Sequence, residues 1–184
     1  MSLEPDLEPP YELVGGEDAG AAWRIRLRKE ILRFRDGSEV EVAKIVAPPA
    51  CVMVPLYDDG TTVLVRQWRP AWWVSSWEAP AGTMEDGEDP LDCARRELAE
   101  EAGLLAGDWE SLGTVRGTAV STVIFHIYLA RKLSATDARL EALEEDLVTR
   151  RLSLQDALSA ARRGEIQHSP SIVALWRAAA YLEG

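Results

Sequence analysis

Residues 82–104 read GTMEDGEDPLDCARRELAEEAGL, an acidic segment built around one short predicted helix. Asp89 is a favourable N-cap, because its side chain can accept hydrogen bonds from the first free amides of a helix. Pro90 suits the first helical position, and Gly103 suits the left-handed residue that follows a helix end. The segment therefore predicts a helix of about three and a half turns between Asp89 and Gly103.

The predicted helix carries two different stripes. The apolar stripe has the three-and-four spacing of a buried helix face and contains Leu91, Ala94, Leu98 and Ala102. The acidic stripe lies about 100° away around the helix and contains Glu97, Glu100 and Glu101. We expect these acids to flank the core and to face outward together.

Carboxylates at this spacing require a compensating cation. Like charges each destabilise an isolated helix by about 0.2–0.5 kcal/mol, and acids near the C-terminus oppose the helix dipole. Arg95 and Arg96 supply positive charge, and the simplest interpretation is a solvated acidic face with an Arg96–Glu100 pair. A metal ion bound by the acids is the alternative.

The spacing of the whole segment favours the metal ion. Nine positions define the pattern, namely Gly82, Glu88, Arg96, Glu97, the aliphatic Leu98, Glu100, Glu101, Gly103 and the aliphatic Leu104. This pattern resembles the complete Nudix box of the Nudix hydrolases. The resemblance implies that Glu97 and Glu101 are the principal metal ligands, that the main-chain carbonyl of Ala81 joins them, and that Glu100 completes the acidic cluster as a catalytic residue.

The same resemblance implies structural roles and a cofactor. Glu88 and Arg96 are expected to form an ion pair that holds the loop to the helix, and Gly82 and Gly103 are structural positions of the box. Hard Mg²⁺ prefers oxygen ligands in near-octahedral geometry, which carboxylates and a carbonyl supply. Mn²⁺ uses similar ligands and stays open as the metal.

Further runs of sequence narrow the resemblance. These runs are VLVRQWRP at residues 63–70, WEAPAG at residues 77–82 and ARRGEI at residues 161–166. Over about residues 22–183 the chain resembles the ADP-ribose pyrophosphatase branch of the Nudix hydrolases. The resemblance implies an α/β (α+β) fold: a Nudix α/β/α sandwich with a central mixed sheet, plus a small N-terminal antiparallel β unit exchanged across a homodimer.

Composition and patterning divide the chain into parts. Residues 1–20 are rich in Glu, Asp, Pro and Gly, and predict a flexible acidic arm. Apolar residues alternate with arginines over residues 23–29, and an Asp36-Gly37 turn follows, so residues 21–47 predict a β unit. Residues 48–184 are then the Nudix hydrolase domain.

This domain has its own predicted elements. They are a hairpin of strands 51–56 and 62–66, strands over 123–129 and 147–152, a helix opened by Ser153 and Asp156, and a terminal helix opened by Ser169 and Pro170.

Three residues are candidates for substrate binding. Arg69 matches the second arginine of the family's Arg-Gln-aromatic-Arg stretch, which implies phosphate contact through its guanidinium fork. Glu78 is implied to hydrogen-bond a ribose or to hold a metal-bound water. Trp23 is a candidate for stacking on adenine, because exchange would carry it to the partner's pocket. Core packing is the simpler interpretation of Trp23, Trp72, Trp73 and Trp77.

The resemblance places the general base in an acidic loop after the box. The candidates precede the predicted strand at 147–152 and are Glu141, Glu144, Glu145 and Asp146. Counting back from the strand favours Glu145 and then Glu144, although a solvated acidic loop explains each residue equally well. His126 and His168 are too isolated in the sequence to indicate a catalytic dyad or a zinc site.

Composition limits the class of protein. A chain of 184 residues with 47% hydrophobic residues suits a single domain with an ample core. Its net charge of −11 argues against binding of long nucleic acids. Cys51 and Cys93 are expected to be buried rather than paired or catalytic. Since no signal peptide is evident and no apolar run approaches the roughly 18 residues of a membrane span, we expect a cytoplasmic protein without a membrane partner.

The resemblance implies hydrolysis of ADP-ribose, or of a close nucleoside diphosphate sugar, to AMP and ribose 5-phosphate. Residues 117–124 lack the proline and the acid that this branch carries after its box, which leaves the sugar specificity open. A GDP-mannose or other nucleotide-sugar pyrophosphohydrolase is therefore the alternative. A non-catalytic nucleotide sensor is disfavoured, because every box carboxylate is retained.

Overall fold

The computed structural model describes residues 9–137 and 147–184, which fall into two units. The first unit contains the described residues up to Pro48 together with residues 118–123. The second unit contains Pro49–Gly117 and the described residues from Ile124 onward. In the described part of the chain, no helix has both the length and the apolar composition of a membrane span.

The first unit is built on an antiparallel sheet in the order β1-β2-β3. The strands are β1 (Tyr11–Ala22), β2 (Ile25–Phe34) and β3 (Glu39–Val46). Gly37 has a φ of 86° in the turn between β2 and β3, a conformation that residues with a Cβ rarely adopt, so the predicted hairpin is confirmed. The prediction of a flexible arm over residues 1–20 is wrong from Tyr11 onward. The acids of β1 instead pair across the sheet, as Asp18 does with Arg28 at 3.3 Å.

The second unit contains two sheets, one mixed and one antiparallel. The mixed sheet has the order β7-β4-β9-β8, with bounds Ala81–Thr83, Ala50–Pro55, Ile124–Ala135 and Leu104–Arg116. The antiparallel sheet has the order β10-β5-β6, with bounds Val148–Ser153, Thr61–Arg69 and Val74–Glu78. Strands β4 and β9 are parallel, whereas β7 and β8 pair antiparallel with their neighbours. The predicted central mixed sheet is thus confirmed.

The helices of the described residues pack on these sheets, and they are α1 (Pro90–Ala102), α2 (Leu154–Arg162) and α3 (Ser169–Glu183). Helix α1 begins after Asp89, whose Oδ1 accepts a hydrogen bond from the Leu91 amide at 2.8 Å. It ends at Gly103, which has a φ of 62°. Helix α2 begins after Ser153, whose hydroxyl accepts a hydrogen bond from the Asp156 amide at 3.0 Å. The local signals read from the sequence therefore set these helix ends.

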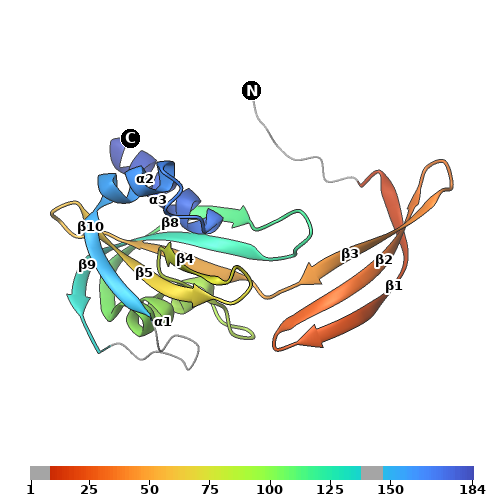
Figure 1. The fold of residues 1–184 in the computed structure, drawn as a ribbon, viewed down its shortest axis with the longest axis horizontal. Coiled ribbons are helices and arrows are strands. Elements are labelled where there is room, and N and C mark those ends of the chain that lie inside the picture. Colours follow the sequence, from red (N-terminus) through yellow and green to blue (C-terminus); the bar gives the residue numbers. More distant parts are fainter. Residues whose placement is uncertain (1–8, 138–146) are drawn as a thin grey trace. The chain divides into compact units, whose positions relative to one another are not determined.

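Side chains of β4 alternate between two cores. Val52 and Val54 pack with α2 and α3, whereas Cys51 and Met53 pack with α1. A fully buried side chain of this size contributes about 1.5–3 kcal/mol of transfer free energy, so β4 anchors both layers. Figure 1 shows α1 on one side of these strands and α2 and α3 on the other. The second unit is therefore the expected α/β/α sandwich.

The predicted hairpin of residues 51–56 and 62–66 is wrong. Its turn exists, since the Tyr57 amide donates to the Thr61 carbonyl at 2.9 Å. However, β4 and β5 share only an isolated bridge between Leu56 and Thr62 and belong to different sheets. Strand β4 is paired by β7 on one side and by β9 on the other, so it has no free edge for β5.

Candidate active site

Two acids of α1 are buried against strand β7. Glu97 is 7% exposed and Glu101 is 1% exposed. A Cβ built on Gly82 would overlap the Glu97 carboxyl group, so only a glycine in β7 lets the helix approach this closely. The expectation that the three acids face outward together is therefore wrong for Glu97 and Glu101, because β7 covers them. The Glu100 side chain stays partly exposed, at 29%.

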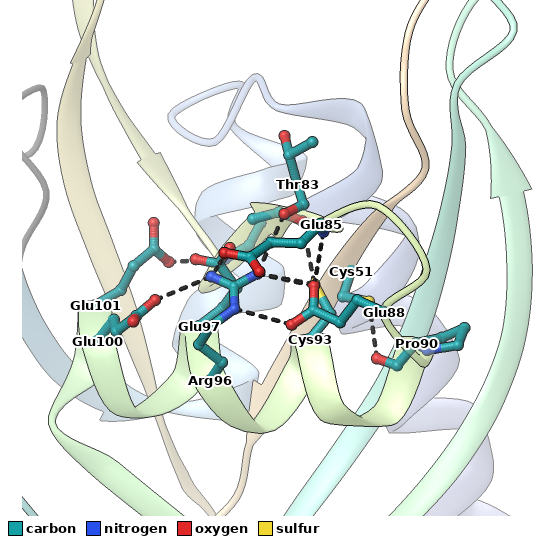
Figure 2. A network of polar contacts seen from close by, with 12 residues as sticks. Cys51, Thr83, Glu85, Glu88, Pro90, Cys93, Arg96, Glu97, Glu100 and Glu101 are labelled. Atoms are coloured by element: carbon teal, nitrogen blue, oxygen red, sulfur yellow. Dashed lines mark hydrogen bonds and ion pairs between the residues drawn. The ribbon is translucent and has the colours of Figure 1, made fainter. Parts of the chain in front are cut away.

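Arg96 links the acids of α1 to the loop that precedes the helix (Figure 2). Its Nε and Nη2 donate to the two Glu88 oxygens at 2.9 and 3.0 Å, and Nη2 also donates to the Thr83 carbonyl at 3.2 Å. Its Nη1 donates to Glu97 at 2.8 Å and to Glu100 at 3.0 Å. The Arg96 guanidinium holds the pKa of Glu88 below its usual value, and hydrogen bonding of Arg96 to Glu88 is the largest of several effects that raise the pKa of Arg96. One guanidinium thus ties the loop, the helix and two box acids together.

A second set of hydrogen bonds orients Glu101. The Ala81 amide of β7 donates to its Oε2 at 2.8 Å. The Gln67 side-chain amide of β5 donates to its Oε1 at 3.4 Å, and Gln67 is itself only 5% exposed. The carboxylate of Glu101 is therefore held by strands from both sheets of the second unit.

The oxygen donors of this region suit a hard divalent cation. Glu97 and Glu100 both reach the same Arg96 nitrogen, so their carboxylates already converge on one point of positive charge. Carboxylate and carbonyl oxygens are the ligands that Mg²⁺ and Mn²⁺ prefer. Over residues 9–137 and 147–184, no three or more His, Cys, Asp or Glu side chains are already grouped as a metal site. In this arrangement Arg96 is the positive partner of Glu97 and Glu100.

A buried carboxylate joins Arg69 to His168. Glu78 is 0% exposed, and its two oxygens accept hydrogen bonds from Arg69 Nε at 2.8 Å and Nη2 at 2.6 Å. His168 Nδ1 lies 3.2 Å from Glu78 Oε2 and 2.8 Å from the Ser171 hydroxyl. Burial lowers the pKa of His168, an effect that the charge of Glu78 opposes and that of Arg69 reinforces. Glu78 thus orients both the Arg69 guanidinium and the His168 imidazole.

Arg69 and His168 line one pocket of about 400 Å³. The lining of this pocket also includes Trp72, Phe125, Ala81 and Gly82. Ala81 and Gly82 belong to β7, where the Ala81 amide contacts Glu101 and Gly82 makes room for Glu97. The pocket therefore adjoins the acids of α1 through the backbone of β7.

Most of the singled-out tryptophans are not in the core. Trp23 is 77% exposed, Trp72 47% and Trp73 78%. Trp23 lies in the turn between β1 and β2, and Trp73 in the turn between β5 and β6. Core packing is therefore the wrong interpretation for these three residues. It holds for Trp77, which packs against the core of the second unit.

The structure tests the prediction for the two cysteines but not that for the general base. The general-base candidates, Glu144 and Glu145 with Glu141 and Asp146, lie outside the described residues. Cys51 and Cys93 are both buried free thiols, as predicted. A hydrogen bond with Cys51, together with burial, raises the pKa of Cys93, so the Cys93 thiol lacks the character of a nucleophile.

Sequence reasoning did not identify Gln67 or His168 as site residues. Gln67 precedes Arg69 by two residues on β5, so strand alternation was a signal that both side chains share one face. His168 lies 90 residues beyond Glu78, and only the packing of α3 brings the two side chains together. No local pattern could reveal that contact.

The sequence comparisons agree with this geometry. The NUDIX domain model matches residues 47–175, and the chain belongs to the Nudix hydrolase family. An ADP-ribose pyrophosphatase of Mycobacterium tuberculosis (strain ATCC 25618 / H37Rv) is 30% identical over 90% of this chain and 81% of the relative. An ADP-ribose pyrophosphatase of Bacillus subtilis (strain 168) is 29% identical over 82% and 83%. A GDP-mannose pyrophosphatase of Citrobacter koseri (strain ATCC BAA-895 / CDC 4225-83 / SGSC4696) is 29% identical over 62% and 64%.

A comparison with solved structures supports the same fold. The crystal structure of an ADP compounds hydrolase matches with a TM-score of 0.84 and 19% sequence identity, over 98% of both chains. The chain is therefore a hydrolase of pyrophosphate bonds, near the ADP-ribose branch of its family.

Proposed function

We propose that this Nudix hydrolase uses Mg²⁺, or Mn²⁺ in its place, to split ADP-ribose or a close nucleoside diphosphate sugar into a nucleoside monophosphate and a sugar phosphate. The observation that carries the proposal is the placement of Glu97 and Glu101 next to a pocket that contains Arg69, with Glu100 joined to Glu97 through Arg96. The two ADP-ribose pyrophosphatase relatives support the choice of substrate.

Hydrolysis of a pyrophosphate needs charge neutralisation, a positioned water and a proton acceptor. A divalent cation bound at the box would neutralise phosphate charge and lower the pKa of a coordinated water. Glu97 and Glu101 are the proposed ligands, with the Ala81 carbonyl as a third. Glu97 and Glu101 are buried, and the Ala81 amide donates to Glu101, so α1 and β7 hold the proposed ligands close together.

Proton transfer is assigned to acids at the edge of this cluster. Glu100 is the best-placed described candidate, since its partly exposed carboxylate shares the Arg96 nitrogen with Glu97. Glu145 and Glu144 are the candidates from the acidic segment before β10. Release of Glu100 from Arg96 on metal binding would free its carboxylate to accept a proton from water.

Arg69 is the proposed phosphate ligand. A guanidinium fork suits two phosphate oxygens, and the Arg69 fork is held in a fixed plane by Glu78. Both Glu78 oxygens are engaged and the residue is fully buried. We therefore assign Glu78 to positioning Arg69 rather than to direct contact with a ribose.

Trp23 is the proposed stacking platform for the adenine base, in a homodimer that exchanges its N-terminal units. Its ring is exposed at a hairpin tip, as a stacking platform must be. One face of the same sheet also exposes a row of apolar side chains, namely Ile25, Leu27, Ile31 and Ile45. A second copy of the chain would remove these side chains from water. Light scattering after size exclusion tests the dimer: a monomer at micromolar concentration would contradict it.

A substrate panel tests the proposed function. The purified protein is incubated with ADP-ribose, ADP-glucose, GDP-mannose and other nucleoside diphosphate sugars, with Mg²⁺, with Mn²⁺ and with a chelator. We expect ADP-ribose to release AMP fastest and the chelator to abolish the reaction. Faster release of GMP from GDP-mannose would establish the alternative, which the GDP-mannose pyrophosphatase relative supports. Binding of these compounds without turnover would indicate a sensor.

A further inference from the structure

His168 is a polar residue of the pocket to which the proposed reaction gives no role. Its side chain is 13% exposed. Its ring centroid lies 6.2 Å from that of Trp72 and 6.1 Å from that of Phe125, so two aromatic rings limit its rotation. A histidine held this firmly in a ligand pocket can select among ligands, because its hydrogen bonds have a fixed direction.

The hydrogen bonds of Nδ1 define what the other ring nitrogen can do. Nδ1 lies within reach of the Glu78 carboxylate and the Ser171 hydroxyl. The Ser171 hydroxyl itself accepts a hydrogen bond from the Ala79 amide at 2.9 Å. With its proton on Nδ1, the ring donates to the Glu78 carboxylate, and Nε2 of that neutral tautomer is an acceptor.

The rest of the pocket indicates which part of a ligand would meet this acceptor. Arg69 is bound to the same carboxylate, so a phosphate bound by Arg69 would lie beside His168. Phe125 meets His168 edge-on, with an interplanar angle of 82°, which leaves Trp72 as the exposed aromatic face among the pocket residues. Among the described residues, the pocket therefore offers the apolar face of Trp72, the cation of Arg69 and the acceptor of His168.

We propose that this pocket holds the sugar-phosphate end of the substrate and that His168 Nε2 accepts a hydrogen bond from a hydroxyl of the terminal sugar. His168 is then a specificity-determining residue, with Arg69 on the adjacent phosphate and Trp72 against the sugar carbons. This inference rests on the proposed function, since it requires a nucleoside diphosphate sugar as the ligand.

The test compares two ligands that differ by the terminal sugar. ADP-ribose carries the sugar, whereas ADP keeps the nucleotide and both phosphates but lacks it. For His168→Leu we expect the Michaelis constant for ADP-ribose to rise about tenfold with a smaller change in kcat, and the inhibition constant of ADP to stay unchanged. His168→Asn keeps a polar side chain and a good N-cap for α3, and should retain part of the affinity for ADP-ribose.

Controls separate this role from a structural one. Gln167→Ala changes an exposed neighbour that does not line the pocket, and should alter neither constant. In both His168 variants, the inhibition constant of ADP could rise as much as the Michaelis constant for ADP-ribose. That result would show that His168 acts only through Glu78 and Arg69, and it would overturn the inference. A wild-type Michaelis constant for ADP-ribose in both His168 variants would also overturn the inference. A wild-type protein that neither binds nor hydrolyses any nucleoside diphosphate sugar would overturn the proposed function as well.

Discussion

The Glu97 carboxyl group lies in the space that a side chain at position 82 would occupy, because a Cβ built on Gly82 overlaps it. This contact explains why a glycine opens the box although position 82 is not a tight turn. Because Gly82 has no side chain, β7 can cover Glu97 of α1. The Glu97 carboxylate is therefore buried and oriented, although the sequence pattern predicts a solvated helix face. The proposed metal site depends on that close approach.

Gly82→Ala should therefore displace Glu97 and lower kcat by about 100-fold, since a shift of about 1 Å in a positioned group has this effect. Circular dichroism should still show a folded protein. Gly20→Ala is the matched control, because a Cβ at Gly20 meets nothing within 4 Å. Wild-type kcat in Gly82→Ala would show that the position of Glu97 does not matter for the reaction.

Glu78→Gln should raise the Michaelis constant for the nucleoside diphosphate sugar about tenfold, because an amide offers Arg69 one acceptor oxygen in place of two. It should also lower the free energy of unfolding by about 1–3 kcal/mol, since a buried charge-assisted pair is lost. Glu165→Gln removes a similar bidentate pair with Arg163, but on the exposed surface, and should change both quantities little. An unchanged Michaelis constant in Glu78→Gln would contradict the positioning role of Glu78.

The ion pair of Glu88 and Arg96 predicts a pH dependence of stability. Arg96 lowers the pKa of Glu88 in the folded state, so the pair stabilises the protein above the pKa of an unfolded glutamate, and this stability is lost as pH falls through the lowered pKa. Glu88→Gln should therefore unfold at a lower temperature than wild type at pH 7, with the difference shrinking towards pH 3. Asp92→Asn, which removes the exposed partner of Arg95, is the control. A difference that grows on acidification would contradict this assignment.

Trp23→Ala separates stacking from packing. Because the ring is 77% exposed, its removal should change the free energy of unfolding by no more than about 0.5 kcal/mol. Loss of a base-stacking ring should raise the Michaelis constant about 10- to 100-fold. Trp73→Ala removes an equally exposed ring, 78% accessible, and should leave the Michaelis constant near wild type. If Trp23→Ala binds substrate normally, the base is held elsewhere.

Local chemistry predicted much of the fold. Asp89, Gly103 and Ser153 fixed helix ends because capping acts within a few residues. The sequence pattern did not predict that β4 and β5 separate into different sheets, since that depends on β7 and β9 occupying both edges of β4.

The candidate site shows the same limit. The spacing of the sequence identified the box acids of α1. It did not predict their burial, because strand β7, which covers them, is not part of the helix pattern. The contact between His168 and Glu78 depends on how α3 packs, which no short motif records. The core prediction was wrong for three of the four tryptophans. Large rings usually favour the core, whereas turns between strands leave Trp23, Trp72 and Trp73 exposed.

The proposed reaction requires Glu97 and Glu101 to hold a divalent ion against the diphosphate. A crystal structure with Mg²⁺ and a slowly hydrolysed nucleoside diphosphate sugar tests it most directly. We predict an ion bound by both carboxylates and by a phosphate oxygen, with Arg69 on the neighbouring phosphate. A diphosphate bound in this pocket with no ion at either carboxylate would contradict the account.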